Sequence, residues 1–132
     1  MNDEPSEILV AQRIRNRVIE HLELTASFEE QRTYQRSAPI QVPNEIINGW
    51  EDLVRDDVLE WFSGPVFTQD EQQAIREFHV TWESVVKDTP RDLPDLEALF
   101  ETQPWERLRV AAEQALRLIH VRGRFGEERE EF

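Results

Sequence analysis

Three histidines and several neighbouring carboxylates are the residues of this chain whose types could support catalysis or metal binding. His21, His79 and His120 each lie at the margin of an apolar stripe with helical spacing, where a histidine is most simply a core-edge residue with its polar tip in water. A helical di-iron site needs a glutamate three residues before the histidine on the same face. A valine and two arginines occupy those positions, so the histidines do not predict a di-iron site.

His79 and Glu83 are one helical turn apart, which is a spacing that allows two side chains to share a divalent cation. No third ligand is indicated by the sequence. Adjacent carboxylates at 29–30, 56–57, 127–128 and 130–131 point roughly a quarter turn apart on a helix, so a cation site would also need acids from a second helix. We therefore keep a divalent-metal hydrolase with carboxylates converging from two helices as an alternative, and assign no metal ligand.

Catalytic sequence motifs are absent. The chain has no glycine-rich phosphate loop, no Gly-x-Ser-x-Gly elbow and no His-Glu-x-x-His motif. It has no cysteine either, which excludes disulfides, thiolate metal sites and thiol nucleophiles. We assign no catalytic residue and expect no cofactor, and the sequence favours a non-enzyme.

The excess of acidic residues is the feature that most restricts the class of molecule that this protein can bind. The 132 residues include 28 acids and 15 bases, a formal net charge of −13, and residues 43–90 hold 11 of the acids and 3 of the bases, a net −8. A field of this sign repels nucleic acid and anionic lipid and attracts cationic proteins. The basic stretch 121–125 is better explained by the preference for arginine at a helix C-terminus. We expect no nucleic-acid or membrane partner, and a basic protein as the partner that fits best.

The acids are densest between residues 51 and 60, where only Arg55 offsets them. They lie off the apolar stripe of a predicted helix and so form an anionic face. Trp50 and Trp61 could anchor a partner on this face, but both lie on the inward stripe, which favours a place in the core. The candidate partner-binding residues are Glu51, Asp52, Asp56, Asp57 and Glu60.

The elements that must position these side chains are helices. Apolar residues recur at three- and four-residue steps, only four glycines occur, and no segment alternates with a period of two. The first helix has a predicted buried stripe at positions 8, 11, 14, 18 and 22. We expect helices over residues 4–24, from Ser27 to before Pro39, and over 45–62, 68–87, 94–100 and 104–121.

Side chains that can cap helices support several of these starts. Ser27 precedes Glu30, and Thr68 precedes Glu71, with the spacing of a capping box that satisfies free backbone donors at a helix N-terminus. Asp3 and Asn44 are the caps we expect for the first and third helices. The helix over 68–87, which has a capping box and further acid in its first turn, has the strongest start signal.

Length and composition fit a single all-α domain. We predict one compact helical bundle of about five or six helices over residues 1–123, with the 68–87 and 104–121 helices at its centre. Residues 124–132, after Gly123, are expected to form a flexible acidic tail. The acidic N-terminus and the lack of an apolar run of membrane-spanning length favour a cytoplasmic protein.

The leading functional hypothesis is a non-catalytic, inhibitor-like or immunity-like protein that binds a basic partner through residues 51–60. Besides the metal hydrolase, a homo-oligomeric structural protein is an alternative, with the amphipathic first helix as the contact between copies.

Overall fold

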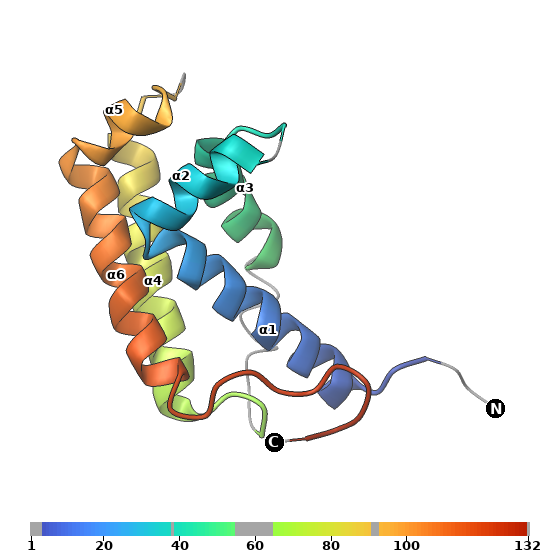
Figure 1. The fold of residues 1–132 in the computed structure, drawn as a ribbon. Helices are drawn as coiled ribbons and strands as arrows, with labels where there is room; N and C mark the ends of the chain where they lie inside the picture. The colour runs from blue at the N-terminus through green and yellow to red at the C-terminus, as the bar shows by residue number, and fades with distance from the viewer. Residues whose placement is uncertain (1–3, 38, 55–64, 91–92, 132) are drawn as a thin grey trace.

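The computed structural model describes residues 4–37, 39–54, 65–90 and 93–131, and six helices account for most of them (Figure 1). The described residues contain no strand, and the all-α prediction is confirmed. None of the helices in these ranges is both long enough and apolar enough to span a bilayer. The helices are α1 (Glu7–Thr25), α2 (Phe28–Ser37), α3 (Val42–Leu53), α4 (Gln69–Asp88), α5 (Leu96–Phe100) and α6 (Gln103–Ile119).

Helices α4 and α6 lie side by side and form the centre of the bundle, as the sequence predicts (Figure 1). The start of α4 has the expected capping box, since Thr68 accepts a hydrogen bond from the Glu71 amide and the Glu71 carboxylate accepts one from the Thr68 amide. The predicted inward residues of α6 are all buried: Trp105, Leu108, Ala112, Ala115 and Ile119. Local sequence signals therefore located both central helices to within two residues at each end.

Helix α1 crosses this pair, and its two halves are buried differently. In the C-terminal half Val18, Ile19 and Leu22 are fully buried and join the apolar core. In the N-terminal half the predicted apolar stripe is only partly buried, and the fully covered residues are Gln12, Arg15 and Asn16. In the first two turns the stripe prediction is confirmed only in part, because Ile8, Ala11 and Ile14 pack against the core but keep some exposed surface.

The end of the chain follows α6 and runs back along α1 (Figure 1). Gly123 has a φ of 73°, a left-handed conformation that lets the chain leave the helix. The sequence predicts a tail separate from the domain after this glycine. In the structure the backbone groups of Phe125, Gly126, Arg129 and Glu131 form hydrogen bonds with the side chains of Gln12 and Asn16.

Helix α3 starts earlier than expected and is described only to its end at Leu53. Its N-cap is Gln41 rather than Asn44, because Pro43 occupies the first turn, where a missing amide hydrogen costs nothing. Ile46 and Trp50 pack into the core with no exposed surface. The remainder of the predicted 45–62 helix, including Trp61, falls largely in 55–64, outside the described residues.

The start of the first helix differs slightly from expectation, whereas the second has its expected cap. Ser6 caps α1 by accepting a hydrogen bond from the Leu9 amide, so α1 begins three residues later than predicted. The predicted cap Asp3 lies outside the described residues. At α2 the Ser27 hydroxyl accepts a hydrogen bond from the Glu30 amide, as the capping-box spacing predicts.

Candidate interaction surface

Two of the five predicted partner-binding acids, Glu51 and Asp52, lie in the last turn of α3, and both are exposed. Glu45 is also exposed and lies two turns before Asp52, so these two carboxylates share one side of the helix. Asp56, Asp57 and Glu60 lie outside the described residues. The described part of the anionic face therefore consists of Glu45, Glu51 and Asp52, which we call the α3 acidic face.

The position of Glu51 and Asp52 is electrostatically unfavourable within the protein. They stand at the C-terminal end of α3, where the helix dipole is negative, and no basic residue occupies that last turn. An acid in such a position costs about 0.3–1 kcal/mol of stability at low ionic strength. A cation supplied by a partner would offset this repulsion.

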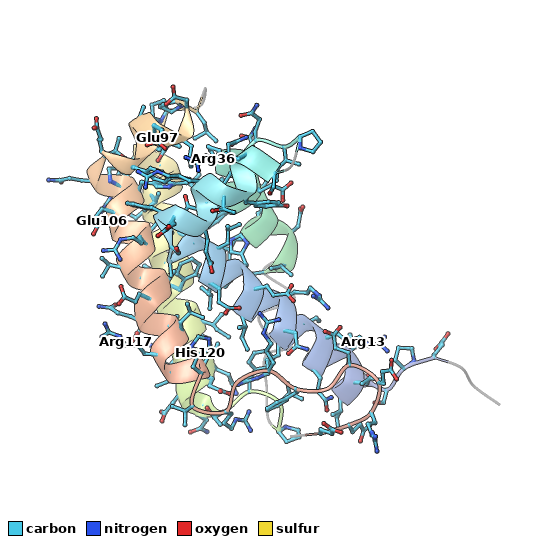
Figure 2. All side chains as sticks on the ribbon, in the orientation of Figure 1. Arg13, Arg36, Glu97, Glu106, Arg117 and His120 are labelled. Atoms are coloured by element: carbon cyan, nitrogen blue, oxygen red, sulfur yellow. The ribbon has the colours of Figure 1, made fainter. Side chains whose placement is uncertain are left out.

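Elsewhere on the surface, arginines pair with carboxylates of the same molecule. Glu20 and Glu23 pair with Arg124, Glu97 with Arg32, and Glu106 and Glu113 with Arg109. Figure 2 shows several of these charged side chains, such as Glu97 and Glu106, on the outside of the bundle. Among the described residues no arginine or lysine forms an ion pair with Glu45, Glu51 or Asp52. Within the described ranges, the α3 acidic face thus lacks the arginine partners that these other carboxylates have.

A hollow of about 410 Å³ lies beside the α3 acidic face, between α3 and the C-terminal end of α4. Ile47 on its wall is one turn before Glu51, so apolar surface of the recess adjoins an exposed carboxylate. The wall comprises Asn44, Ile47 and Asn48 of α3, Val86 of α4, and Thr89, Pro90 and Leu93. Such a recess can accept an apolar side chain that stands next to a cationic one.

Beneath this surface, Trp50 is part of the core and is not an exposed anchor, which agrees with its place on the inward stripe. Its indole N–H donates a hydrogen bond to Nδ1 of His79 at 3.1 Å. Nε2 of His79 lies 2.8 Å from a carboxylate oxygen of Glu83. These contacts assign the proton of a neutral His79 to Nε2, which donates to Glu83, and leave Nδ1 as the acceptor.

The predicted His79 and Glu83 pair is therefore a direct hydrogen bond in this structure. Within the described ranges no three side chains of His, Asp or Glu come close enough to hold a metal ion together. His79 also stacks on Trp82, with ring centroids 5.5 Å apart. Both ring nitrogens of His79 thus have partners, and the geometry explains its burial as a packing and hydrogen-bonding role.

The other two histidines occupy contrasting environments. His21 is largely buried against Gly49 and Trp50, and its burial lowers the pKa of its imidazole to about 4, although the backbone of Ile46 partly opposes this. No hydrogen-bond partner within the described structure reaches its Nε2. His120 is the C-cap residue of α6 and is exposed (Figure 2).

The sequence analysis did not identify the buried ion pair between Arg15 of α1 and Glu71 of α4. Arg15 has no exposed surface, and its two terminal nitrogens contact the two Glu71 oxygens at 2.9 and 2.8 Å. Its remaining donor contacts go to the carbonyl oxygens of Val66, Ile119 and Gly123. Together these contacts satisfy the five N–H donors of the guanidinium group.

A second arginine, Arg122, also contacts Glu71, at 3.0 Å. Burial alone would raise the pKa of Glu71, but hydrogen bonds from Arg15, the Thr68 amide and Arg122 outweigh it and leave that pKa below its ordinary value. The rings of Phe67 and Phe125 lie against the Arg15 guanidinium. Because each polar group here is used inside the protein, the cluster joins α1, α4 and the chain end, and offers no free group to a ligand.

One sequence signal could have identified these buried polar residues. Gln12, Asn16 and Ile19 follow one another at steps of four and three and share a side of α1 with Leu22. A polar residue that continues an apolar stripe at helical spacing is a candidate for burial against backbone carbonyls and amides.

Comparison of the chain with protein-family models, curated protein sequences and solved structures finds no match. A function for this chain must therefore be argued from its own residues and their geometry.

Proposed function

We propose that this chain is a non-catalytic interaction protein that binds a basic protein partner through the α3 acidic face, in the manner of small acidic inhibitors. The predicted residues Asp56, Asp57 and Glu60 would extend the same contact. The supporting observation is that Glu51 and Asp52 are exposed at the negative end of α3 without a described cation beside them. Arginines from the protein itself compensate many acids elsewhere.

Two further features support this proposal. The net charge of −13 favours fast association with a cationic protein, because long-range attraction raises the rate of encounter. The hollow next to Glu51, lined by both apolar and polar side chains, provides a place for an anchoring side chain, which specific interfaces need in addition to charge. The partner we propose presents arginines or lysines around an apolar residue.

The test compares two double charge reversals that change the net charge equally. Glu51→Lys with Asp52→Lys alters the α3 acidic face, whereas Glu101→Lys with Glu128→Lys alters exposed acids that form no described ion pair. Proteins retained on immobilised wild type are identified by mass spectrometry, and the affinity of each purified candidate is measured by calorimetry.

We expect the α3 reversal to weaken the complex at least about tenfold, and the control reversal to change the affinity by less than about threefold. Equal weakening by both variants would show that only bulk charge matters. Unchanged binding of the α3 variant would remove this face from the interaction. Either of these two results rejects the proposal.

A further inference from the structure

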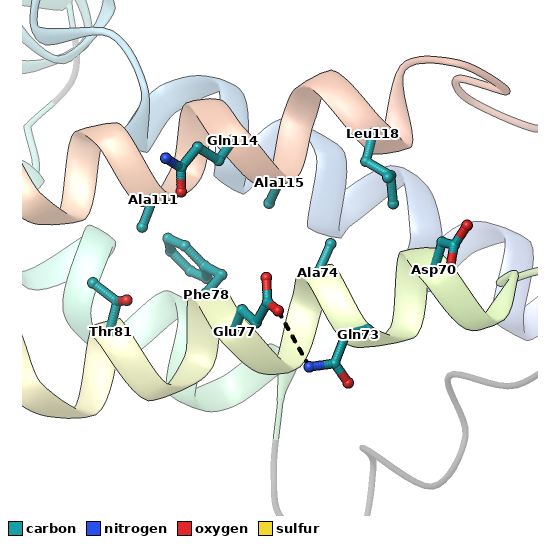
Figure 3. Close-up of a pocket in the computed structure, with 10 residues that line it drawn as sticks. All are labelled: Asp70, Gln73, Ala74, Glu77, Phe78, Thr81, Ala111, Gln114, Ala115 and Leu118. Atoms are coloured by element: carbon teal, nitrogen blue, oxygen red, sulfur yellow. Dashed lines mark hydrogen bonds between the residues drawn. The ribbon is translucent and has the colours of Figure 1, made fainter.

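A second surface, distinct from the α3 acidic face, lies along the seam between the two central helices. A groove of about 320 Å³ lies between α4 and α6. Figure 3 shows Phe78 of α4 and Leu118 of α6 directed toward the space between these helices. It lies on a different side of α4 from α3, because Ala74 and Thr81 line the groove whereas His79 faces α3.

Small apolar side chains form the floor of the groove. Ala74 of α4 and Ala111 and Ala115 of α6 leave little side-chain bulk above the seam, so another backbone can approach closely. Leu118 remains 36% exposed and Val110, one position before Ala111, remains 37% exposed. Leu118 thus offers exposed apolar surface among the lining residues of the groove, whereas Val110 is not one of them.

The charges of the groove have one sign. Asp70 and Glu77 of α4 line it, and no basic side chain is among its lining residues. Glu77 accepts a hydrogen bond of 3.3 Å from Gln73, which lines the same wall, and has no ion pair among the described residues. An occupant therefore needs an apolar side for the alanines and cations for the α4 wall.

The length of the groove fits a short helix. Its lining residues on α4 run from Asp70 to Thr81, a span of about 16 Å at 1.5 Å per residue. An amphipathic helix of about eleven residues has the same length, and its apolar stripe matches a furrow between two parallel ridges. A second copy of this chain suits the groove poorly, because a net charge of −13 would face another of equal sign.

We propose that the α4–α6 groove binds an amphipathic helix that is apolar on one side and rich in lysine or arginine on the other. The small residues of the groove allow the backbone of the bound helix to approach α4 and α6 closely. The carboxylates of Asp70 and Glu77 favour a cationic helix. This inference goes beyond the proposed function, because it assigns a different surface and does not depend on Glu51 or Asp52.

The experiment is an NMR titration of the ¹⁵N-labelled chain with a synthetic fourteen-residue peptide that has leucines at helical spacing and lysines elsewhere. Saturable shifts are expected at the amides of Ala74, Ala111, Ala115 and Leu118. A peptide of the same composition in scrambled order, and one with glutamate in place of lysine, are expected to bind at least about tenfold more weakly. Shifts confined to α3, or equal binding of the scrambled peptide, would overturn the inference.

Matched variants separate the groove from its surroundings. Ala111→Leu fills the furrow, while Val110→Leu places the same side chain one position away, outside the lining residues. Glu77→Lys removes an acid of the wall, with Glu101→Lys as the control. We expect a loss of at least about tenfold for Ala111→Leu and Glu77→Lys, and less than about threefold for the two controls.

Two readouts complete the test. The variant with Glu51→Lys and Asp52→Lys should show the same groove shifts as wild type, whatever becomes of the α3 acidic face. Sedimentation of the free chain should show a monomer. A dimer whose interface includes Ala111 would replace the proposed helix by a second copy and overturn the inference.

Discussion

At the scale of single residues, the buried Arg15 and Glu71 pair has the largest expected effect on stability. Both side chains are almost fully buried, and removing one charge leaves the other without a counter-ion in a poorly solvated place. Breaking such a pair costs about 3–5 kcal/mol, whereas an exposed pair contributes less than about 1 kcal/mol. Breaking a buried ion pair therefore lowers the stability of the fold much more than breaking an exposed one.

Glu71→Gln tests this difference. Glutamine is also accepted at the third position of a capping box, so the substitution removes the charge and keeps the possibility of a cap. We expect the free energy of unfolding to fall by about 3–5 kcal/mol in urea denaturation. Glu106→Gln, which breaks an exposed pair with Arg109, should cost less than about 1 kcal/mol. Equal losses for the two variants would contradict the assigned burial.

His21 makes stability depend on pH. Its pKa is about 4 in the folded chain and 6.5 ordinarily, so the folded state binds its proton less readily than the unfolded state. The contribution of neutral His21 is fully present above pH 6.5 and is lost as the pH falls from 6.5 through 4, by about 3 kcal/mol. His21→Phe should flatten the wild-type curve in this window when unfolding is measured at successive pH values. Parallel curves for both proteins would show that His21 is not buried as described.

At the scale of elements, side chains of α1 hold the last described residues of the chain. They form hydrogen bonds with backbone groups that have no partner in a helix or sheet. Asn16 donates to the Phe125 carbonyl and accepts from the Phe125 amide, at 2.8 and 3.0 Å. Gln12 donates to the carbonyls of Gly126 and Arg129 and accepts from the Glu131 amide. Several backbone groups of the segment therefore have side-chain partners although the segment belongs to no helix or sheet.

Asn16→Ala tests whether these bonds fix the segment. We expect faster hydrogen exchange at the amides of residues 125–131 and a loss of about 1–3 kcal/mol of stability, because the partly buried carbonyl and amide of Phe125 lose their partner. Thr33→Ala, at an exposed site on α2, is the control. If these amides exchange at unprotected rates in wild type, residues 124–132 form the flexible tail that the sequence predicts.

At the scale of the whole molecule, the net charge of −13 opposes compaction through long-range repulsion. The Debye length falls from about 30 Å at 0.01 M salt to about 8 Å at 0.15 M, so salt removes repulsion between distant acids first. Short exposed ion pairs are also screened, but each contributes little. Repulsion is therefore the larger effect for this chain at low ionic strength.

We predict that the melting temperature rises between 10 and 150 mM sodium chloride, as measured by differential scanning calorimetry. Reversal of Glu51 and Asp52 to lysine adds two charges at each position and changes the net charge from −13 to −9. The rise should be smaller for that variant than for wild type. A melting temperature that falls with salt would show that the internal ion pairs outweigh the repulsion.

The sequence by itself determined the helical class, the two central helices, and the burial of Trp50 and Trp105. Each of these follows from neighbours within a few residues, since a capping box spans three residues and a helical stripe repeats every three or four. Only the tertiary structure decided that Gln12, Arg15 and Asn16 are buried, that His21 lies against Gly49, and that α4 and α6 leave a groove between them. The partners of Arg15 are 51 to 108 residues away along the chain. The spacing of neighbouring residues does not predict which distant carbonyl or carboxylate a side chain will contact. Those contacts are set by the packing of the helices.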